Sequence, residues 1–374
     1  CARSGAGGEA LKIIEFTVDH FQVPLPAVLS DATHGEMTHF GLITVRIVDD
    51  QGCEGLGYTY TVHGIGASAI RALIRDDLGP FLLASNPDPL EDFWQSMWWR
   101  VHFVGRGGIG AFAMAAIDIA LWDLQARSAG QPLWRFLGGS NRQVQAYAGG
   151  IDLDFSIDEL IAQGEGFLAQ GFQAIKMKVG RPVLDEDVSR VGAMREFLGS
   201  DFPLMVDANM RWSAREAEHA AKALAPMGPY WLEEPTIPDD IEGHARVASS
   251  GGIPIASGEN LHSVYEFRDL IKRGGVTYPE PDAATLGGIT PWLEVASLAE
   301  SSGLRVTSHG VHDIHVHLLA AVRNASYLEV HGFGLEQFIA EPLSLEDGLA
   351  LAPERAGHGI SLDFAALEEY RLPD

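Results

Sequence analysis

The sequence predicts an α/β fold in which a (β/α)8-type, modified TIM barrel follows an N-terminal α+β capping domain. Two observations predict the barrel. Three short apolar runs between residues 203 and 260 end in the carboxylates Asp207, Glu233 and Glu259, with a step of 26 residues each time. That step holds one strand, one helix and two loops, as in a βα unit whose strand is buried on both faces. Similar runs recur on both sides of this stretch, whereas alternating apolar and polar residues near the N-terminus predict the separate cap.

The N-terminal part has the pattern of an antiparallel sheet. We expect strands at 11–23, 39–49 and 53–58, with a polar loop over 30–37 between the first two. From residue 67 the apolar residues recur with a helical period, and such segments continue to residue 124. Strands followed by helices predict an α+β capping domain over residues 10–140.

From residue 141 the chain reads as a series of βα units that ends near residue 342. Eight strands are expected, at 143–148, 174–179, 203–208, 230–234, 254–259, 278–282, 305–309 and 326–330. Helical segments such as 158–169, 213–225 and 291–302 lie between them, which predicts a barrel. An open doubly wound sheet is the alternative, but a Gly-rich turn is missing after the first strand. Residues 343–374 are expected to return to the capping domain.

Composition limits the partners of the protein. The chain has 374 residues, 46% of them apolar, and a formal net charge of −25. This acidity argues against nucleic acid or an anionic membrane surface as a partner. The sequence contains no run of 18 apolar residues, so we expect no membrane-spanning helix. The two cysteines, Cys1 and Cys53, fit a reducing cytoplasm. Residues 1–9 lack an apolar signal core and are expected to be a disordered lead.

Acidic residues at the ends of neighbouring strands predict a metal site. In a closed parallel barrel the C-terminal ends of all strands meet at one rim. Asp207, Glu233 and Glu259 would repel one another there unless a cation held them together. Lys176 and Lys178 stand two residues apart on the preceding strand, so both point to one face. Such a lysine can act as a base if burial or a cation lowers its pKa, and a structural ion pair is the alternative.

Later strands add further polar residues to the same rim. The sixth strand ends at Asp282 and the seventh at His309, so the carboxylate could orient the imidazole as a general base or acid. Glu329 lies on the eighth strand, across the barrel from the metal site. Lys178 and His309 would then flank a metal-bound substrate, which is the geometry for removing a proton α to a carboxylate through an enediolate.

In these motifs the sequence resembles the mandelate racemase subgroup of the enolase superfamily. The resemblance covers residues 11–370 and includes the Lys-X-Lys pair, the Asp-Ala-Asn, Glu-Glu-Pro and Gly-Glu-Asn strand ends, and the later Asp, His and Glu residues in order. It implies a Mg2+-dependent enzyme that acts on a small acid, with loops 29–39 and 58–66 of the cap closing over the site. It also implies, weakly, a homo-oligomer.

The resemblance assigns roles to the residues named above. It implies Asp207, Glu233 and Glu259 as the Mg2+ ligands, and Lys178 as one base whose pKa is lowered by Lys176. His309, oriented by Asp282, would be the second base or the acid. Glu329 would hydrogen-bond the substrate carboxylate. Asn209, and His34 and Tyr60 of the cap loops, are the candidate substrate-binding residues; exposed loop residues without such a role are the alternative for the last two.

Further segments are similar to 3,6-anhydro-L-galactonate cycloisomerases, which open an anhydro-sugar acid to a 2-keto-3-deoxy acid. They include Leu29–Gly35, Gly57–Thr61 and Leu328–His331. Galactarate-type dehydration, or racemisation of a 2-hydroxy acid, remains the alternative, because the residue set permits each. At Glu280 the subgroup commonly has Gln. This extra inward carboxylate would need a lysine partner or a proton, and we expect it to pair below the metal site without a catalytic role.

Two other classes of function are disfavoured. A zinc hydrolase on a barrel would need a His-X-His pair on the first strand, which reads Gln143–Tyr147. A non-catalytic binding protein would be indicated by the loss of a metal ligand or a base, and all of those residues are present.

Overall fold

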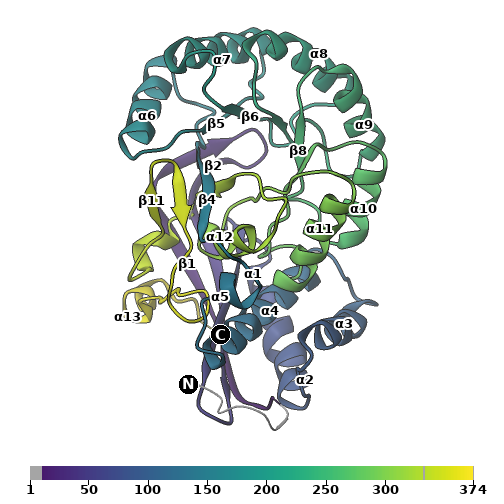
Figure 1. The fold of residues 1–374 in the computed structure, drawn as a ribbon, viewed down its shortest axis with the longest axis vertical. Coiled ribbons are helices and arrows are strands. Elements are labelled where there is room, and N and C mark those ends of the chain that lie inside the picture. The colour runs from purple at the N-terminus through teal and green to yellow at the C-terminus, as the bar shows by residue number, and fades with distance from the viewer. Residues whose placement is uncertain (1–10, 332, 374) are drawn as a thin grey trace.

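The computed structural model describes residues 11–331 and 333–373 of the chain, so the predicted N-terminal lead lies outside the described residues. The chain forms a barrel domain and a smaller α+β domain that packs against it (Figure 1). In the figure, helices α6 to α11 arch around the barrel strands, and α2, α3 and α4 lie at the opposite end of the molecule.

The N-terminal sheet is antiparallel, with the strand order β1-β2-β3. Its strands are β1 (Ile13–Asp31), β2 (Gly35–Asp49) and β3 (Glu54–Val62). The strands are longer than the sequence pattern indicated, because pairing continues through the polar residues to Asp31 and Gly35. The predicted loop over 30–37 is therefore reduced to a turn of residues 32–34, and Tyr60 lies on β3 and not on a loop.

The helices of this domain pack against the sheet and against one another. They are α1 (Ala67–Leu73), the π-helical η1 (Ile74–Leu78), α2 (Gly79–Leu83), α3 (Leu90–Val101), α4 (Ile109–Ser128) and α5 (Leu133–Phe136). Helix α4 is long and apolar enough to cross a membrane. The sequence did not predict such a helix, because it contains no uninterrupted run of 18 apolar residues. However, 83% of its most apolar 18-residue window is buried within the fold, so it is the core helix of this domain.

The barrel is built of parallel strands joined by helices. The strands are β4 (Gln143–Gly149), β5 (Ile175–Lys178), β6 (Leu204–Asp207), β7 (Leu232–Glu233), β8 (Ile255–Ser257), β9 (Tyr278–Pro279) and β10 (Leu328–Val330). The helices are α6 (Ile157–Ala169), α7 (Leu184–Leu198), α8 (Ala214–Leu224) with η2 (Ala225–Met227), α9 (Ile241–Ser250), α10 (Val264–Lys272), α11 (Ile289–Ser301) and α12 (His312–Ala321). Strand β10 pairs with β4 and closes the barrel.

The seventh predicted strand, 305–309, is present only as a single bridge between Val306 and Ala325. The backbone N–H of Thr307 still donates to the carbonyl of Pro279 at the end of β9 (2.9 Å). This irregular segment therefore connects β9 to the closing strand without forming a regular ladder, which suits a modified barrel.

The C-terminal segment contacts both domains. It contains η3 (Leu335–Phe338), β11 (Ser344–Glu346), β12 (Leu349–Leu351), α13 (Phe364–Leu367) and η4 (Glu368–Tyr370). Strand β12 pairs antiparallel with β4 of the barrel. At its end, the N–H of Leu372 donates to the carbonyl of His20 in β1 (2.8 Å), so the segment also reaches the capping sheet.

Candidate active site

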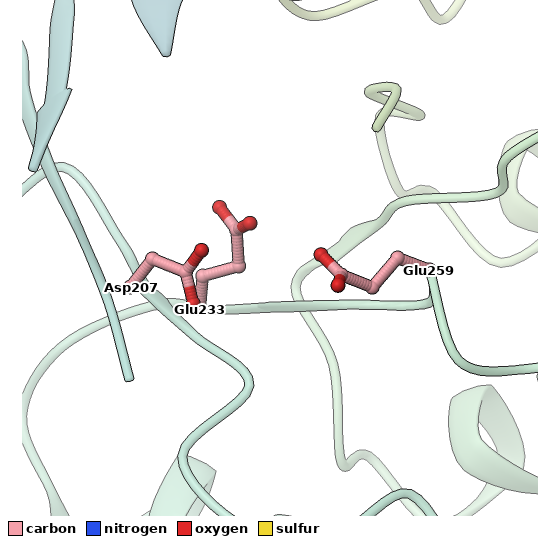
Figure 2. A group of neighbouring side chains, drawn as sticks. All are labelled: Asp207, Glu233 and Glu259. Carbon is pink, nitrogen blue, oxygen red and sulfur yellow. The ribbon is translucent and has the colours of Figure 1, made fainter. Parts of the chain in front are cut away.

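Three carboxylates from neighbouring strands converge at the C-terminal rim of the barrel. Asp207 ends β6, Glu233 ends β7 and Glu259 lies two residues after β8. One oxygen of each lies within 4.8 Å of the others, and Figure 2 shows the three side chains directed toward a common region. The 26-residue βα step predicted this convergence, because each strand ends at the same level of the barrel.

Two buried lysines of β5 neutralise part of this charge. The Nζ atom of Lys178 donates to Oδ2 of Asp207 (2.5 Å), and the Nζ atom of Lys176 donates to Oε1 of Glu233 (2.5 Å). Lys176 also lies 2.7 Å from Oε1 of Glu329. The two lysines share one face of β5, as their spacing predicted.

Glu329 lies on the closing strand β10 and contacts the opposite side of Lys176. Its second oxygen, Oε2, accepts the backbone N–H of Gly310 (2.8 Å). Burial opposes the ionisation of Glu329, but Lys176 and His309 hold its pKa below the ordinary value. Both oxygens are engaged by the protein, and the hydrogen bond from Glu329 to a substrate carboxylate stays a prediction.

His309 and Asp282 form a dyad on the far side of the carboxylates. The Nδ1 atom of His309 lies 3.1 Å from Oδ2 of Asp282, and its Nε2 atom lies 3.3 Å from Oε2 of Glu259. The hydroxyl of Tyr60 donates to the same Oδ2 (2.7 Å). The ring of His309 is therefore anchored at Nδ1, while Nε2 faces the carboxylate group.

A second histidine fixes the backbone around this dyad. Nε2 of His315 accepts the N–H of Ala283 (2.9 Å), so Nδ1 carries the proton and donates to the carbonyl of Gly310 (2.7 Å). Burial lowers the pKa of His315 and keeps the ring neutral. His315 thus joins the residues after β9 to the rim residues that follow His309. His315 lies on α12, and no sequence pattern indicated this contact.

The pKa of Lys178 was expected to be lowered, and in the structure it is raised. Burial does lower it, but the charges of Asp207, Glu259 and Asp31 together outweigh this effect and the pKa of Lys178 is raised. Likewise burial lowers the pKa of His309, whereas Glu259 and Asp282 raise it, with a net value of about 10. The charge of Lys176 lowers the pKa of Lys178, as predicted, but its effect is weaker than that of Asp207.

The donor set fits a hard divalent cation. Mg2+ prefers carboxylate oxygens, and here three of them cluster. Burial and the charge of Asp207 raise the pKa of Glu233, although Lys176 opposes this shift. Glu259 has no lysine partner in the described chain, and its Oε2 is buried without a hydrogen bond. His309 faces this oxygen (3.3 Å), and burial together with the charge of Asp207 raises the pKa of Glu259 as well. A cation among the three carboxylates would relieve their repulsion.

A cavity of about 330 Å³ opens above the carboxylates, between the barrel rim and the cap. It is lined by Lys178, Glu259 and His309, by the three candidate substrate-binding residues Asn209, His34 and Tyr60, and by apolar residues that include Phe40, Ile65, Phe112 and Phe333. The Oδ1 atom of Asn209 is buried and has no hydrogen-bond partner among the described residues, so it is available to a ligand. The structure thus places six of the eleven predicted site residues on the walls of one small-molecule cavity, while Lys176, Asp207, Glu233, Asp282 and Glu329 lie outside its lining.

Three neighbours of these residues were not singled out in the sequence. Asp31 holds His34, because its carboxylate accepts the backbone N–H of His34 (2.6 Å) and lies 2.8 Å from Nδ1. The Asp-X-X-His spacing is typical of an Asx turn and could have indicated this pair. Trp231 donates from Nε1 to Oε2 of Glu233 (2.9 Å), as residues two apart on a strand can. Phe333 lines the cavity, but no sequence pattern marks it.

Glu280 is completely buried, as are Asp207 and Glu233 of the carboxylate triad. No ion pair joins it to a lysine or arginine in the described part of the chain, so the expected lysine partner is absent. The hydroxyl of Tyr147 donates weakly to its Oε1 (3.4 Å), and burial, with the charge of Glu233, raises its pKa well above the ordinary value. The protonated form, which was the other expectation, is the one this environment favours.

Sequence and structure comparisons identify relatives of the chain. The family model described as "Enolase C-terminal domain-like" matches residues 159–366, and the "Mandelate racemase / muconate lactonizing enzyme, N-terminal domain" model matches residues 13–138. The 3,6-anhydro-alpha-L-galactonate cycloisomerase of Streptomyces coelicolor is 52% identical over 349 residues, which cover 93% of this chain and 96% of that protein.

Two solved structures are also similar. A racemase from Streptomyces coelicolor A3(2) with bound magnesium is 50% identical, with a TM-score of 0.94 over 96% of this chain and 100% of that one. The L-talarate dehydratase from Polaromonas sp. JS666, complexed with Mg and L-glucarate, is 34% identical, with a TM-score of 0.91 over 97% of this chain and 98% of that one.

Proposed function

Because the chain belongs to the mandelate racemase and muconate lactonizing enzyme family of the enolase superfamily, we propose that it is a Mg2+-dependent enzyme that removes the α-proton of an acid sugar. The proposed substrate is 3,6-anhydro-L-galactonate, and the proposed product is a 2-keto-3-deoxy sugar acid. One observation carries the proposal: Lys178 and His309 lie at opposite ends of a single carboxylate triad, beside Asp207 and Glu259 respectively.

In this reaction Lys178 would take the α-proton, and His309 would give a proton to the leaving oxygen. The electron pair of the C–H bond first moves toward the substrate carboxylate and gives an enediolate, which can take the proton back. When the enediolate collapses, a C=C bond forms as the ring ether C–O bond breaks, and the enol then becomes the 2-keto-3-deoxy acid. Atoms balance, because one proton leaves carbon and one reaches oxygen. A base and an acid on opposite faces, each held by its own carboxylate, can perform this elimination.

Asp207, Glu233 and Glu259 would hold the metal. When bound, Mg2+ supplies positive charge that stabilises the anion developing on the substrate carboxylate. The same charge balances the carboxylates that raise the pKa of Lys178, and this would let the lysine lose its proton near neutral pH. Asn209 and His34 would contact substrate hydroxyl groups from the wall of the cavity.

Dehydration of an aldarate is the second candidate. It is favoured by the similarity to the L-talarate dehydratase complexed with Mg and L-glucarate, and it uses the same two steps with water as the leaving group. A homo-oligomer in the cytoplasm completes the proposal. Light scattering from the purified chain tests the oligomeric state, and a monomer at micromolar concentration would contradict it.

The deciding experiment is NMR in D2O with Mg2+ and a panel of sugar acids that includes 3,6-anhydro-L-galactonate and galactarate. We expect a 2-keto-3-deoxy product from the anhydro acid, and loss of that product when EDTA removes the metal. Turnover of galactarate alone would replace the substrate but keep the chemistry. No exchange of an α-proton in any acid would overturn the proposed function.

A further inference from the structure

The capping domain contributes a side chain directly to the His309–Asp282 dyad. We propose that Tyr60 is a positioning residue, which fixes the tautomer and orientation of His309 through Asp282 and so makes one half of the active site depend on the cap. The proposal deepens the proposed function and rests on it for the role of His309. It revises the sequence-based expectation that Tyr60 reads the substrate from a loop.

Three atoms define the arrangement. The hydroxyl of Tyr60 lies 2.7 Å from Oδ2 of Asp282 and 3.2 Å from Nδ1 of His309, and the last two atoms are 3.1 Å apart. A neutral tyrosine has one proton to donate, and the ionised oxygen of Asp282 is the stronger acceptor. Nδ1 of His309 must then carry a proton in order to face this oxygen favourably, so that Nε2, on the side of Glu259, is the nitrogen from which the ring gives or takes a proton.

Both oxygens of Asp282 are committed in this arrangement. Oδ1 accepts the N–H of Ala284 (2.7 Å), and Oδ2 receives Tyr60 and His309. Without the hydroxyl, only one donor would hold Oδ2 in the plane of the imidazole. A side chain held by fewer hydrogen bonds samples more orientations, and the geometry of proton transfer tolerates little displacement.

Tyr60 is itself held rigidly. It is buried on β3, its ring stacks on Phe333 (centroids 4.6 Å apart) and it meets Phe40 edge to face (6.0 Å). A Cβ atom on Gly310 would lie 2.4 Å from the ring of Phe333 and 3.3 Å from the hydroxyl of Tyr60. The glycine next to His309 therefore leaves the space that this side chain fills.

Within the described residues, no hydrogen bond joins the other base, Lys178, to the cap, although the charge of Asp31 in β1 contributes to its raised pKa. Nζ of Lys178 donates to Asp207, and its backbone N–H donates to Asp152 (2.9 Å); both partners belong to the barrel. Loss of the Tyr60 hydroxyl should therefore impair the His309 step and leave the Lys178 step largely intact. This asymmetry separates positioning from a general loosening of the fold.

The direct test is ¹⁵N NMR of histidine-labelled full-length protein with Mg2+, comparing wild type with Tyr60→Phe. His309→Asn assigns the His309 signals among the 14 histidines. Spectra recorded over a range of pH reach the neutral form of His309, which we expect to be the tautomer protonated at Nδ1 in wild type and a mixture of tautomers in Tyr60→Phe. Tyr58→Phe is the matched control, because Tyr58 is another buried tyrosine of β3 and makes no hydrogen bond to the dyad that the structure records. An unchanged His309 signal in Tyr60→Phe would overturn the proposal.

A kinetic measurement checks the consequence. We expect Tyr60→Phe to lower kcat for product formation about 10- to 100-fold, the effect of one hydrogen bond to a charged group, with KM and α-proton exchange near their wild-type values. Equal losses of exchange and product would contradict a positioning role. If no acid exchanges at all, the proposed function fails, while the NMR spectrum still decides whether Tyr60 sets the tautomer of His309.

Discussion

The two sides of the carboxylate triad are built in different ways. The Lys178 side consists of side chains from the adjacent strands β5, β6 and β7, all between residues 176 and 233. The His309 side joins Tyr60 of the cap to Asp282 and His309 of the barrel, across 222 and 249 residues of chain. One side is a local product of the barrel, and the other exists only because two domains pack together.

This difference teaches where control of the reaction can lie. Short strands that are hydrogen-bonded on both sides hold their end residues firmly, so the orientation of Lys178 depends mainly on the barrel. The orientation of His309 depends in addition on the packing of β3. A change in the cap should therefore act on the second step of the reaction before it acts on the first.

Replacement of the two bases should give the largest effects and the clearest separation. We expect Lys178→Met to lower both α-proton exchange and product formation by about 10³-fold or more, because general-base catalysis is lost. His309→Asn should lower product formation by about 10²- to 10⁴-fold while exchange continues. Exchange and product are followed together by NMR in D2O with Mg2+.

A control variant and one alternative outcome test which residue is the base and which is the acid. Lys178→Arg keeps the charge beside Asp207 but supplies no base at neutral pH, so it should resemble Lys178→Met. If exchange were lost in His309→Asn and retained in Lys178→Met, the acid and base assignments would be exchanged and the dependence on the cap would apply to the first step.

The same contrast explains what could be predicted from the sequence. The triad and the Lys-X-Lys pair follow from strand periodicity and from the common rim of a parallel barrel, so their positions were visible in the spacing alone. The dyad was expected for the same reason, from the ends of two strands. Its third member was not, because a contact between Tyr60 and Asp282 has no local signature.

Other expectations failed for physical reasons. Polar residues around Ser30 indicated a loop, but inter-strand hydrogen bonds extend β1 and β2 through them. The seventh barrel strand is only a bridge at Val306, since its backbone groups bond irregularly to both neighbours. The direction of the Lys178 pKa depends on the distance to Asp207, which a sequence does not give.

Crowding β3 against α4 should give the next largest effect. A Cβ atom at position 57 would lie 2.1 Å from the carbonyl oxygen of Ala116 and 2.5 Å from the N atom of Ala120. Backbone cannot move aside cheaply, so Gly57→Ala should destabilise the protein by about 3 kcal/mol, measured by urea unfolding. Because Tyr60 lies three residues further along β3, product formation should fall more than α-proton exchange. Gly166→Ala, with open space around it, is the control, and equal stability of the two variants would contradict this packing.

A buried carboxyl at the contact between cap and barrel should make stability depend on pH. Burial raises the pKa of Asp118 to about 7, although its oxygens accept the N–H (2.9 Å) and hydroxyl (2.7 Å) of Thr290. A carboxyl with a raised pKa in the folded state favours folding at low pH, and this contribution is lost as pH rises through about 7. Between pH 5 and 8 we expect wild type to lose roughly 2 kcal/mol relative to Asp118→Asn. Parallel unfolding profiles of the two proteins would contradict the shift.

The smallest effect should come from a barrel helix that takes part in neither side of the site. Gly192 lies in the middle of α7, and a Cβ atom there would have no neighbour within 4 Å. Gly192→Ala should stabilise the protein by about 0.5–1 kcal/mol, because alanine loses less backbone entropy in a helix. Urea unfolding measures the gain, and both exchange and product formation should stay at wild-type rates.

The matched control is Gly164→Ala in α6, where the new atom would meet Phe197 at 3.0 Å and Met194 at 3.2 Å. The entropy gain should be offset there by this crowding. If Gly192→Ala altered the ratio of product formation to exchange, the barrel helices would also influence His309, and the division of the active site into a local half and a cap-dependent half would be wrong.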